Sequence, residues 1–256
     1  AKIETIQKIA SKTLEEPIEI FEEACIGKKL TFLSADKYVM AIGAGETTKS
    51  KSEISGDAML QLRLKDGKYL VAISDGMGTG TKARQSSTSS LRMLENLLLS
   101  GFDKTISLDL INTSLIGQNT ETFATLDIAI IDLYEGTIEF IKSGACPTYI
   151  KNNKKVQIIK STSLPTGMVD ENHNHIQTFD RDIKSGDILV MCSDGILDAN
   201  IEYKNKELWV KYMLEDIETT NTKKIADLIL NEAIDNTFGN VKDDMSVIVC
   251  KFKEKD

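Results

Sequence analysis

The chain has 256 residues, of which 41% are hydrophobic and 27% are charged, and its net charge at pH 7 is −8. This composition is that of a globular protein with enough apolar residues for a sizeable core. The acidic balance argues against nucleic acid or an anionic membrane as the main partner, because both require a basic surface.

No stretch of the sequence approaches the roughly 18 apolar residues of a membrane-spanning helix, and no signal peptide is visible. The four cysteines (Cys25, Cys146, Cys192 and Cys250) are far apart and form no CxxC pair. We therefore expect buried, reduced cysteines in a cytoplasmic domain. The chain begins at Ala1 without an initiator Met, which leaves room for a regulatory or membrane-anchoring segment upstream.

Residues 1–24 form the first predicted element, a helix. Ile3, Ile6 and Ile9 fall on one helical face, and apolar residues continue after Pro17. The helix either packs on the main domain or ends an upstream regulatory or dimerising domain, and we favour the second interpretation because the recognisable motifs begin only after it. The expected division is a helical segment at 1–24 and one domain at 25–256.

Strand-like runs dominate the rest of the chain. Asp66 and Gly67 lie between two apolar runs, and an Asp-Gly in that position predicts a β-hairpin. The predicted strands share short β-branched or apolar sequences bounded by turn residues, and they cover 30–33, 38–42, 59–64, 69–73, 126–133, 138–141, 148–150, 156–159, 187–192 and 245–252. Amphipathic patterns predict helices at 81–100, 104–117, 207–215 and 223–233, and the polar segment 49–55 is expected to be a loop.

The order of these elements predicts the fold class. Hairpin connections dominate, and strands and helices do not alternate, so the sheets should be mostly antiparallel. We expect an α+β fold in which two sheets pack face to face and helices cover the outside.

Aspartates stand where the predicted core strands begin or end. Asp75 and Asp194 each follow an apolar run in the same tripeptide, Ser-Asp-Gly. Asp57 opens the first strand of the hairpin, and Asp243 and Asp244 precede the last strand. A single Asp-Gly is usually an ordinary turn, but the repeated tripeptide after an unbroken strand favours a metal site. Carboxylates without His or Cys point to Mg²⁺ or Mn²⁺ rather than zinc.

The segment after Asp75 contains Gly76, Gly78 and Gly80 before a helix begins. Several backbone N–H groups therefore lie beside a carboxylate, which favours a bound ion or an anionic group. A pair of hard cations activates a water for in-line attack on a phosphoryl group. That chemistry needs no nucleophilic side chain, and the sequence has no convincing Cys or Ser nucleophile motif.

Six blocks of the sequence resemble, in order, the PPM (PP2C-type) phosphatases, and within them the stage II sporulation protein E group. The blocks are Ser55-Gly56-Asp57, Ile73-Ser74-Asp75-Gly76-Met77-Gly78-Thr79-Gly80, Phe123-Ala124-Thr125-Leu126-Asp127, Leu164-Pro165-Thr166-Gly167, residues 185–196 and residues 242–249. The resemblance covers roughly residues 30–252. The resemblance implies an αββα sandwich, with two Mn²⁺ or Mg²⁺ ions at one end of the two sheets.

The resemblance also implies roles for the aspartates. By motif, Asp75 would bridge both ions and the carbonyl of Gly76 would complete one site. Asp194 and Asp243 would hold the other ion, so Asp75, Asp194 and Asp243 form the expected catalytic set. Asp57 matches a position that usually contacts metal through water. Asp244 stands where relatives often have Asn, which implies a supporting role.

The sequence departs from the family pattern where substrate phosphate would bind. Many eukaryotic relatives have an Arg near the first acidic motif, whereas this region offers only Lys49 and Lys51. His173 and His175 are assigned to a solvated loop rather than to a metal site. Asp127 lies within a predicted strand, and the sequence provides no reason to make it catalytic.

The resemblance implies a metal-dependent protein serine/threonine phosphatase. Its substrate would be a phosphorylated anti-sigma-factor antagonist, dephosphorylated to release a sporulation sigma factor. Relatives are thought to be switched by movement of the helices here predicted at 81–100 and 104–117, and these helices follow Asp75 directly. The switch helices or the N-terminal helix would also serve for a homodimer. Two alternatives stay open: a catalytically weak interaction module, and a hydrolase of small phosphoesters.

Overall fold

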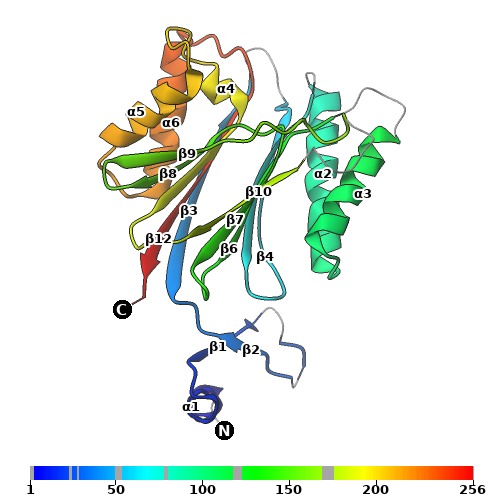
Figure 1. Cartoon of the computed structure of the whole chain (residues 1–256), viewed down its shortest axis with the longest axis vertical. Coiled ribbons are helices and arrows are strands. Elements are labelled where there is room, and N and C mark those ends of the chain that lie inside the picture. The colour runs from blue at the N-terminus through cyan, green and yellow to red at the C-terminus, as the bar shows by residue number, and fades with distance from the viewer. Residues whose placement is uncertain are drawn as a thin grey trace.

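The computed structural model describes residues 3–22, 25–27, 29–49, 54–77, 80–117, 123–168 and 176–255. In this part of the chain two five-stranded antiparallel sheets pack face to face, and helices cover the outer face of each sheet (Figure 1). The predicted α+β class, an αββα sandwich of two mostly antiparallel sheets flanked by helices, is confirmed. No helix among the described residues is long and apolar enough to cross a bilayer.

The first sheet lies under the pair of helices that follows Asp75. Its strands, in spatial order, are β10 (Gln177–Asp182), β7 (Thr137–Ser143), β6 (Leu126–Asp132), β5 (Tyr69–Asp75) and β4 (Asp57–Arg63). Its outer face is covered by α2 (Thr81–Leu99) and α3 (Lys104–Ile116). Because β5 is buried on both faces, its sequence is an unbroken apolar run rather than an alternating one.

The second sheet contains the last strand of the chain. Its spatial order is β3 (Tyr38–Thr47), β12 (Met245–Glu254), β11 (Ile188–Cys192), β8 (Thr148–Asn152) and β9 (Lys155–Ile159). The helices on its outer side are α4 (Asp194–Leu197), α5 (Lys206–Asp216) and α6 (Thr222–Asn236). β3 continues past the predicted 38–42 because it pairs with β12 along its whole length. α6 packs closely on it: a Cβ at Gly43 would lie 2.5 Å from the backbone nitrogen of Lys223.

The N-terminal segment differs from the predicted helix 1–24. The helix α1 (Ile3–Leu14) ends before Pro17, and Ile18–Ile20 is a strand, β1, which pairs with β2 (Phe32–Ser34). Proline cannot continue a helix, and the β-branched residues after it favour a strand. This small unit lies below the sandwich in Figure 1. The β1–β2 pairing crosses residue 24, while the boundary at 24/25 stays a prediction.

Three apolar layers form the core and hold the strand ends in place. Val71, Phe140 and Met191 are buried between the sheets. Leu94 of α2 is buried against the first sheet, and Trp209 of α5, predicted to be a packing residue, is buried against the second. Each fully buried side chain of this kind stabilises the fold by about 1.5–3 kcal/mol. The side chains at the strand ends are therefore presented from a rigid frame.

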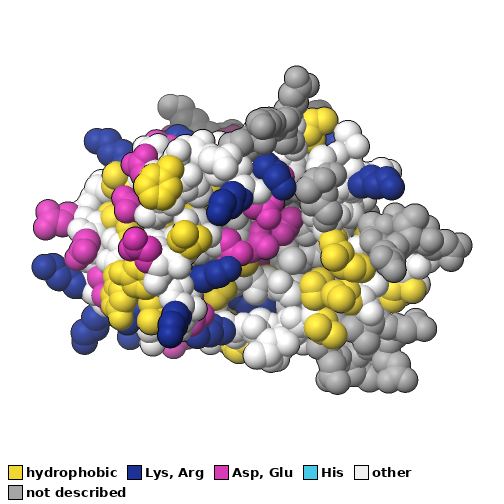
Figure 2. All heavy atoms as spheres, turned by 90° about the horizontal axis from the view of Figure 1, so that it is seen from above, with side chains coloured by type: hydrophobic (Ala, Val, Ile, Leu, Met, Phe, Trp, Pro, Cys, Tyr) yellow, Lys and Arg dark blue, Asp and Glu magenta, His cyan; other side chains and the backbone are white. Residues whose placement is uncertain are grey.

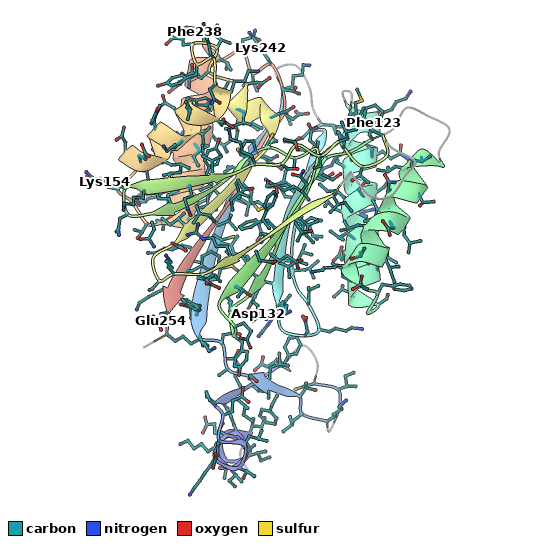
Figure 3. All side chains as sticks on the ribbon, viewed as in Figure 1. Phe123, Asp132, Lys154, Phe238, Lys242 and Glu254 are labelled. Carbon is teal, nitrogen blue, oxygen red and sulfur yellow. The ribbon has the colours of Figure 1, made fainter. Side chains whose placement is uncertain are left out.

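Strand register brings the predicted aspartates to one end of the sandwich. Asp57 and Asp75 are directly opposite each other in the β4–β5 ladder. Asp194 follows β11 and Asp243 precedes β12, and these two strands are also antiparallel neighbours. In Figure 3 this end carries the labels Phe123 and Lys242, and the far end carries Asp132 and Glu254.

Candidate metal centre

Asp57 lies at the base of the site and is 1% exposed. Within the described residues its Oδ2 atom has no hydrogen-bond partner, and neither has the hydroxyl of Ser246, which is buried close to the same strand ends. A buried carboxylate oxygen without a donor is costly, because desolvation is not repaid. These two atoms are suited to a ligand that arrives from outside the chain.

Asp75 is half-buried and is held through its own backbone. Its N–H donates to the hydroxyl of Thr125 at 2.9 Å, and its carbonyl accepts from the N–H of Thr125 at 2.8 Å. The next residue must be glycine, because a Cβ at Gly76 would collide with the carbonyl oxygen of Ala83 in the first turn of α2. The hydroxyl of Ser87 in α2 also donates to the Gly56 carbonyl at 2.6 Å. The start of α2 is thus packed directly on the Asp75 turn.

Asp194 and Asp243 form the rim of the site and are exposed. Asp194 begins the short helix α4. The serine before it, Ser193, exchanges backbone and side-chain hydrogen bonds with Ser246: the Ser193 N–H donates to the Ser246 carbonyl at 3.0 Å, and the Ser246 N–H donates to the Ser193 hydroxyl at 2.9 Å. These bonds fix the junction between the end of β11 and the start of α4.

The carboxylate of Asp244 is hydrogen-bonded within the protein, whereas that of its neighbour Asp243 is exposed. The Asp244 carboxylate accepts hydrogen bonds from the backbone N–H groups of Lys49 at 2.8 Å and Gly56 at 2.6 Å. It thereby connects the segment after β3 and the residue before β4 to the start of β12. Both oxygens are thereby used within the protein. This arrangement is consistent with the supporting role expected for Asp244.

The carboxylates raise one another's pKa. Burial raises the pKa of Asp75 to about 8, and the charges of Asp194, Asp57 and Asp243 add to the rise. Burial raises the pKa of Asp57 to about 7. The nearby hydroxyls of Ser193 and Ser246 oppose this rise, and the charges of Asp194 and Asp244 add to it. Partial burial raises the pKa of Asp194 to about 6, and the charge of Asp243 adds to the rise. Within the described residues none of these four metal-ligand candidates forms an ion pair with Lys or Arg.

The donor set fits hard divalent cations. Carboxylates and a backbone carbonyl are the ligands that Mg²⁺ and Mn²⁺ prefer, and the uncompensated negative charge requires a cation. In the described ranges no three His, Cys, Asp or Glu side chains surround one point as in a closed metal site. Mg²⁺ commonly binds one or two carboxylates and keeps several waters, so open sites of this kind suit it.

A cavity of about 130 Å³ opens beside Asp75 and Asp194. It lies between the two sheets at their common end and is lined by Ile73, Asp75, Thr125, Asp127, Gly144, Ala145, Cys146, Cys192, Ser193 and Asp194. At roughly 30 Å³ per molecule, such a volume corresponds to about four waters. The face seen from above in Figure 2 has acidic side chains gathered at its centre and Lys and Arg side chains around them.

The cavity is bordered by a buried ion pair that the sequence did not reveal. The ammonium of Lys142, which is 0% exposed, donates to the Asp127 carboxylate at 2.6 Å, to the Thr148 hydroxyl at 2.7 Å and to the Cys146 carbonyl at 2.6 Å. Thr148 in turn donates to Asp127 at 3.0 Å. The network joins β6 and β7 of the first sheet to β8 of the second.

The structure also adds a cation near the site that the sequence did not single out. Arg84, in the first turn of α2, donates from its Nη1 to the carbonyl of Asp57. A guanidinium has four further N–H donors, so it is suited to phosphate oxygens. Lys49, near the first acidic motif, donates its backbone N–H to Asp244. Lys51, His173 and His175 lie outside the described residues.

The chain matches the family model of stage II sporulation protein E over residues 65–253. It is 36% identical over 225 residues to stage II sporulation protein E of Priestia megaterium, which covers 88% of this chain and 38% of that protein. It is 35% identical over 223 residues to the Bacillus subtilis (strain 168) protein of the same name, which covers 87% of this chain and 27% of that protein. The chain therefore spans about a third of the length of these curated relatives.

Solved structures agree with this assignment. The PP2C phosphatase domain with a fragment of the regulatory domain of SpoIIE from Bacillus subtilis superposes with a TM-score of 0.83 at 32% identity, over 99% of this chain and 75% of that one. RsbX in complex with magnesium shares the fold alone, with a TM-score of 0.64 at 16% identity over 92% of this chain and 100% of that one. The chain belongs to the stage II sporulation protein E family and is a PP2C-type serine/threonine phosphatase domain.

Proposed function

We propose that this domain removes phosphate from serine or threonine of a protein substrate with two Mn²⁺ or Mg²⁺ ions. Asp75 and the Gly76 carbonyl would ligate one ion, Asp75, Asp194 and Asp243 the other, and Asp57 would act through water. One observation carries the proposal: four aspartates lie at the same end of the sandwich, where burial and mutual repulsion raise the pKa of three of them. No Lys or Arg of the described chain forms an ion pair with any of the four.

When bound, the ions supply an activated water and offset negative charge on the phosphoryl oxygens. The chain's own residues do the positioning. Thr125 fixes the backbone of Asp75, and the Ser193–Ser246 bonds fix the start of the helix that carries Asp194. Arg84 offers guanidinium donors beside Asp57 for the phosphate of the substrate. The cavity at Asp75 and Asp194 leaves room for water next to these groups.

The substrate we propose is a phosphorylated anti-sigma-factor antagonist, whose dephosphorylation would activate a sporulation sigma factor. The names of the relatives support this choice, since both are stage II sporulation proteins. We also propose a cytoplasmic setting and regulation through α2 and α3. The support for regulation is the packing of Ala83 and Ser87 on the Asp75 turn, through which a movement of α2 would shift a metal ligand.

A homodimer is part of the same proposal. The N-terminal helix exposes Ile3, Ile6 and Ile9, and the α3 region exposes Phe102 and Ile106. Exposed apolar groups of this kind favour contact with another protein surface. Either the N-terminal helix or the switch helices would form the interface.

The proposal is tested by comparing a phosphoserine protein, a phosphoserine peptide and p-nitrophenyl phosphate as substrates, each with Mn²⁺, with Mg²⁺ and with EDTA. We expect metal-dependent turnover of the phosphoserine protein. Turnover of p-nitrophenyl phosphate alone would support a small-phosphoester hydrolase instead. Absence of all metal-dependent turnover would support a catalytically weak interaction module.

A further inference from the structure

A groove runs along one side of the sandwich, away from the metal centre. β10 is the edge strand of the first sheet and β9 is the edge strand of the second. Two adjoining hollows of about 590 and 600 Å³ lie between these edges and share Gln157, Arg181 and Lys184 in their walls. We call the two hollows together the lateral groove. Each is within the range of about 300–1,000 Å³ typical of ligand sites.

The sign of its charge sets the lateral groove apart from the rest of the molecule. The chain has a net charge of −8, yet the first hollow is lined by cationic side chains and by no carboxylate. These cations are Lys154, Lys155, Arg181 and Lys184. In the described part of the chain, the ammonium groups of Lys154, Lys155 and Lys184 have no carboxylate partner. Uncompensated cations in a hollow attract anionic groups.

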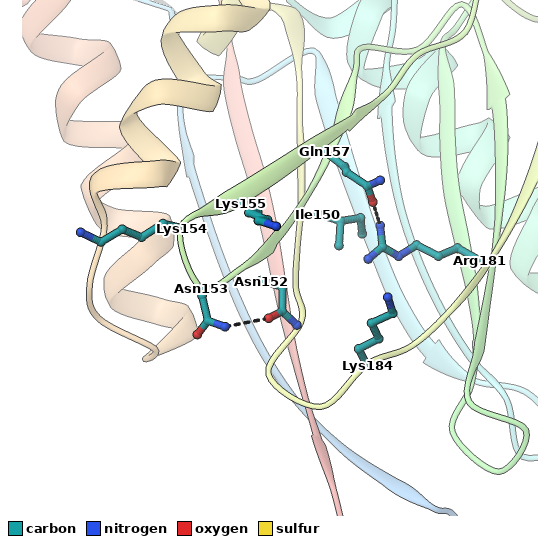
Figure 4. A pocket seen from close by; sticks show the side chains of 8 residues that line it. All are labelled: Ile150, Asn152, Asn153, Lys154, Lys155, Gln157, Arg181 and Lys184. Atoms are coloured by element: carbon teal, nitrogen blue, oxygen red, sulfur yellow. Dashed lines mark hydrogen bonds between the residues drawn. The ribbon is translucent and has the colours of Figure 1, made fainter.

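The contacts inside the groove leave cations available. Arg181 donates to Gln157 across the groove and to Asp187 at 3.3 Å, so it is held as part of the wall. Figure 4 shows the Gln157 side chain meeting Arg181 above Ile150, Lys184 below Arg181, and Lys154 turned outward at the tip of the β8–β9 hairpin. Lys155 and Lys184 are exposed, line the first hollow and have no carboxylate partner in the described residues, so they are available to an anionic group.

The shape of the groove favours an extended chain over a compact ligand. Its walls are two edge strands, β9 with five residues and β10 with six, and edge strands carry backbone groups without a ladder partner on one side. Ile150, which is 2% exposed, provides an apolar floor. The second hollow contains Asp180 and Asp182, and its Lys160 is paired with Glu207, so the attraction for an anion is concentrated at Lys155 and Lys184.

The direction of β10 relates the groove to the metal centre. Gln177 pairs with Lys142, which borders the cavity at Asp75, and Asp182 pairs with Thr137 at the far end. Six residues of strand span roughly 17 Å, so a chain in the groove extends away from the site by about that length. A bound segment would thus lie several residues from the residue that undergoes hydrolysis.

We infer that the lateral groove binds an extended acidic segment of the phosphoprotein substrate, at a distance from its phosphorylated residue. The inference rests on the proposed function, since it takes the occupant to be the substrate. An acidic segment matches the groove because its carboxylates would meet Lys155 and Lys184 while its backbone follows an edge strand. Docking there adds binding to the protein substrate without touching the reacting groups.

The test uses two phosphoserine peptides that differ only in a tail of five glutamates or five glutamines. The wild-type domain with Mn²⁺ is expected to have a kcat/KM about tenfold higher for the glutamate tail, an effect typical of two favourable charge contacts. Lys155→Glu together with Lys184→Glu should remove this preference. The matched control, Lys65→Glu with Lys224→Glu, reverses two exposed lysines elsewhere and should keep it. Turnover of p-nitrophenyl phosphate should be equal in all three proteins.

A binding measurement separates this inference from the proposed function. Fluorescence anisotropy of the unphosphorylated glutamate-tail peptide with metal-free protein needs no catalysis. Weaker binding in the groove variant than in the control supports the groove, even if no phosphorylated probe is turned over. Equal binding by both variants overturns the inference, and so does a groove variant that loses p-nitrophenyl phosphate turnover. Binding of an RNA oligomer or of anionic vesicles, but not of the peptide, also overturns it.

Discussion

Two buried aspartates of the first sheet have opposite surroundings. Asp127 is 3% exposed, and its two oxygens accept from Lys142 at 2.6 Å and from Thr148 at 3.0 Å. Asp57 is 1% exposed, and its Oδ2 has no hydrogen-bond partner in the described residues. The carboxylates of Asp194 and Asp244 raise its pKa, and Arg84 reaches only its backbone carbonyl. The carboxylate of Asp127 is neutralised by a lysine of the chain, whereas the carboxylate of Asp57 lies close to other carboxylates.

The difference explains what each region is for. A buried carboxylate is tolerated when a cation and hydrogen bonds surround it, as at Asp127, where the pair ties the sheets together. Where several carboxylates meet without a cation, the charge must be balanced by protons or by ions from solution. The Asp127 network is therefore structural, and the cluster of Asp57, Asp75, Asp194 and Asp243 is suited to metal.

The largest effect is expected from Asp75→Asn. Removing this charge should lower Mn²⁺-dependent turnover at least about 10³-fold, since the ions supply several kcal/mol of transition-state stabilisation. The metal-free variant should melt at the same temperature as the wild type or higher, because the folded state no longer has to protonate a buried carboxylate at this position. The control is Asp66→Asn, which alters the exposed Asp-Gly of the β4–β5 turn and should leave activity unchanged. Retained activity in Asp75→Asn would refute the site.

Disrupting the buried Lys142–Asp127 pair should lower the stability of the fold. Lys142→Met leaves Asp127 buried without its cation, which costs about 3–5 kcal/mol. For a domain of this size the melting temperature should fall by about 10 °C in a calorimetric scan. Adding Asp127→Leu should recover most of the loss, because the unpaired charge then disappears. A single variant that melts within 2 °C of the wild type would show that the pair is not a structural tie.

The pH dependence of stability should differ with and without metal. The pKa values of Asp57, Asp75 and Asp194 are raised to about 7, 8 and 6 in the folded, metal-free protein, from an ordinary 3.8. Between about pH 4 and pH 8 the folded state then holds more protons than the unfolded state. The free energy of unfolding is therefore not reduced by these groups below about pH 4, and it falls as the pH rises to about 8. Urea unfolding at several pH values should show this slope in EDTA and a weaker one in Mn²⁺. A slope unaffected by metal would contradict the raised pKa values.

The smallest effect is expected at Asp244, the carboxylate that is already used within the protein. Asp244→Asn keeps one acceptor oxygen and loses the other, so the N–H of either Lys49 or Gly56 is left without its partner. The free energy of unfolding should drop by about 1–2 kcal/mol, while Mn²⁺-dependent kcat falls only a few-fold. A loss as severe as that of Asp75→Asn would make Asp244 a metal ligand instead.

The sequence was informative wherever local chemistry determines structure. The apolar run 69–73 with Asp75 after it predicted a buried strand ending in a carboxylate, and the hairpin at Asp66-Gly67 is present as predicted. The αββα class followed from hairpin spacing and from the six family blocks. The sequence could not predict contacts between residues far apart in the chain. Lys142 has no distinctive local signal, and its role follows only from its position opposite Asp127.

Elements with weak local signals were missed. β10 (Gln177–Asp182) is mostly polar, and it is a strand because it pairs with β7 at the sheet edge, where alternate side chains stay exposed. The four-residue α4 is too short to show a helical period. Arg84 was not picked out as a phosphate-binding candidate because only the packing of α2 on the Asp75 turn brings it to Asp57.

The most direct test of the metal centre is calorimetric titration of Mn²⁺ into the metal-free domain at pH 7, repeated in buffers of different ionisation enthalpy. Binding to carboxylates whose pKa is about 7 to 8 must displace protons, so we expect two ions bound and about one proton or more released. Binding without proton release, or equal binding by Asp75→Asn, would contradict the claim that this carboxylate cluster holds the ions.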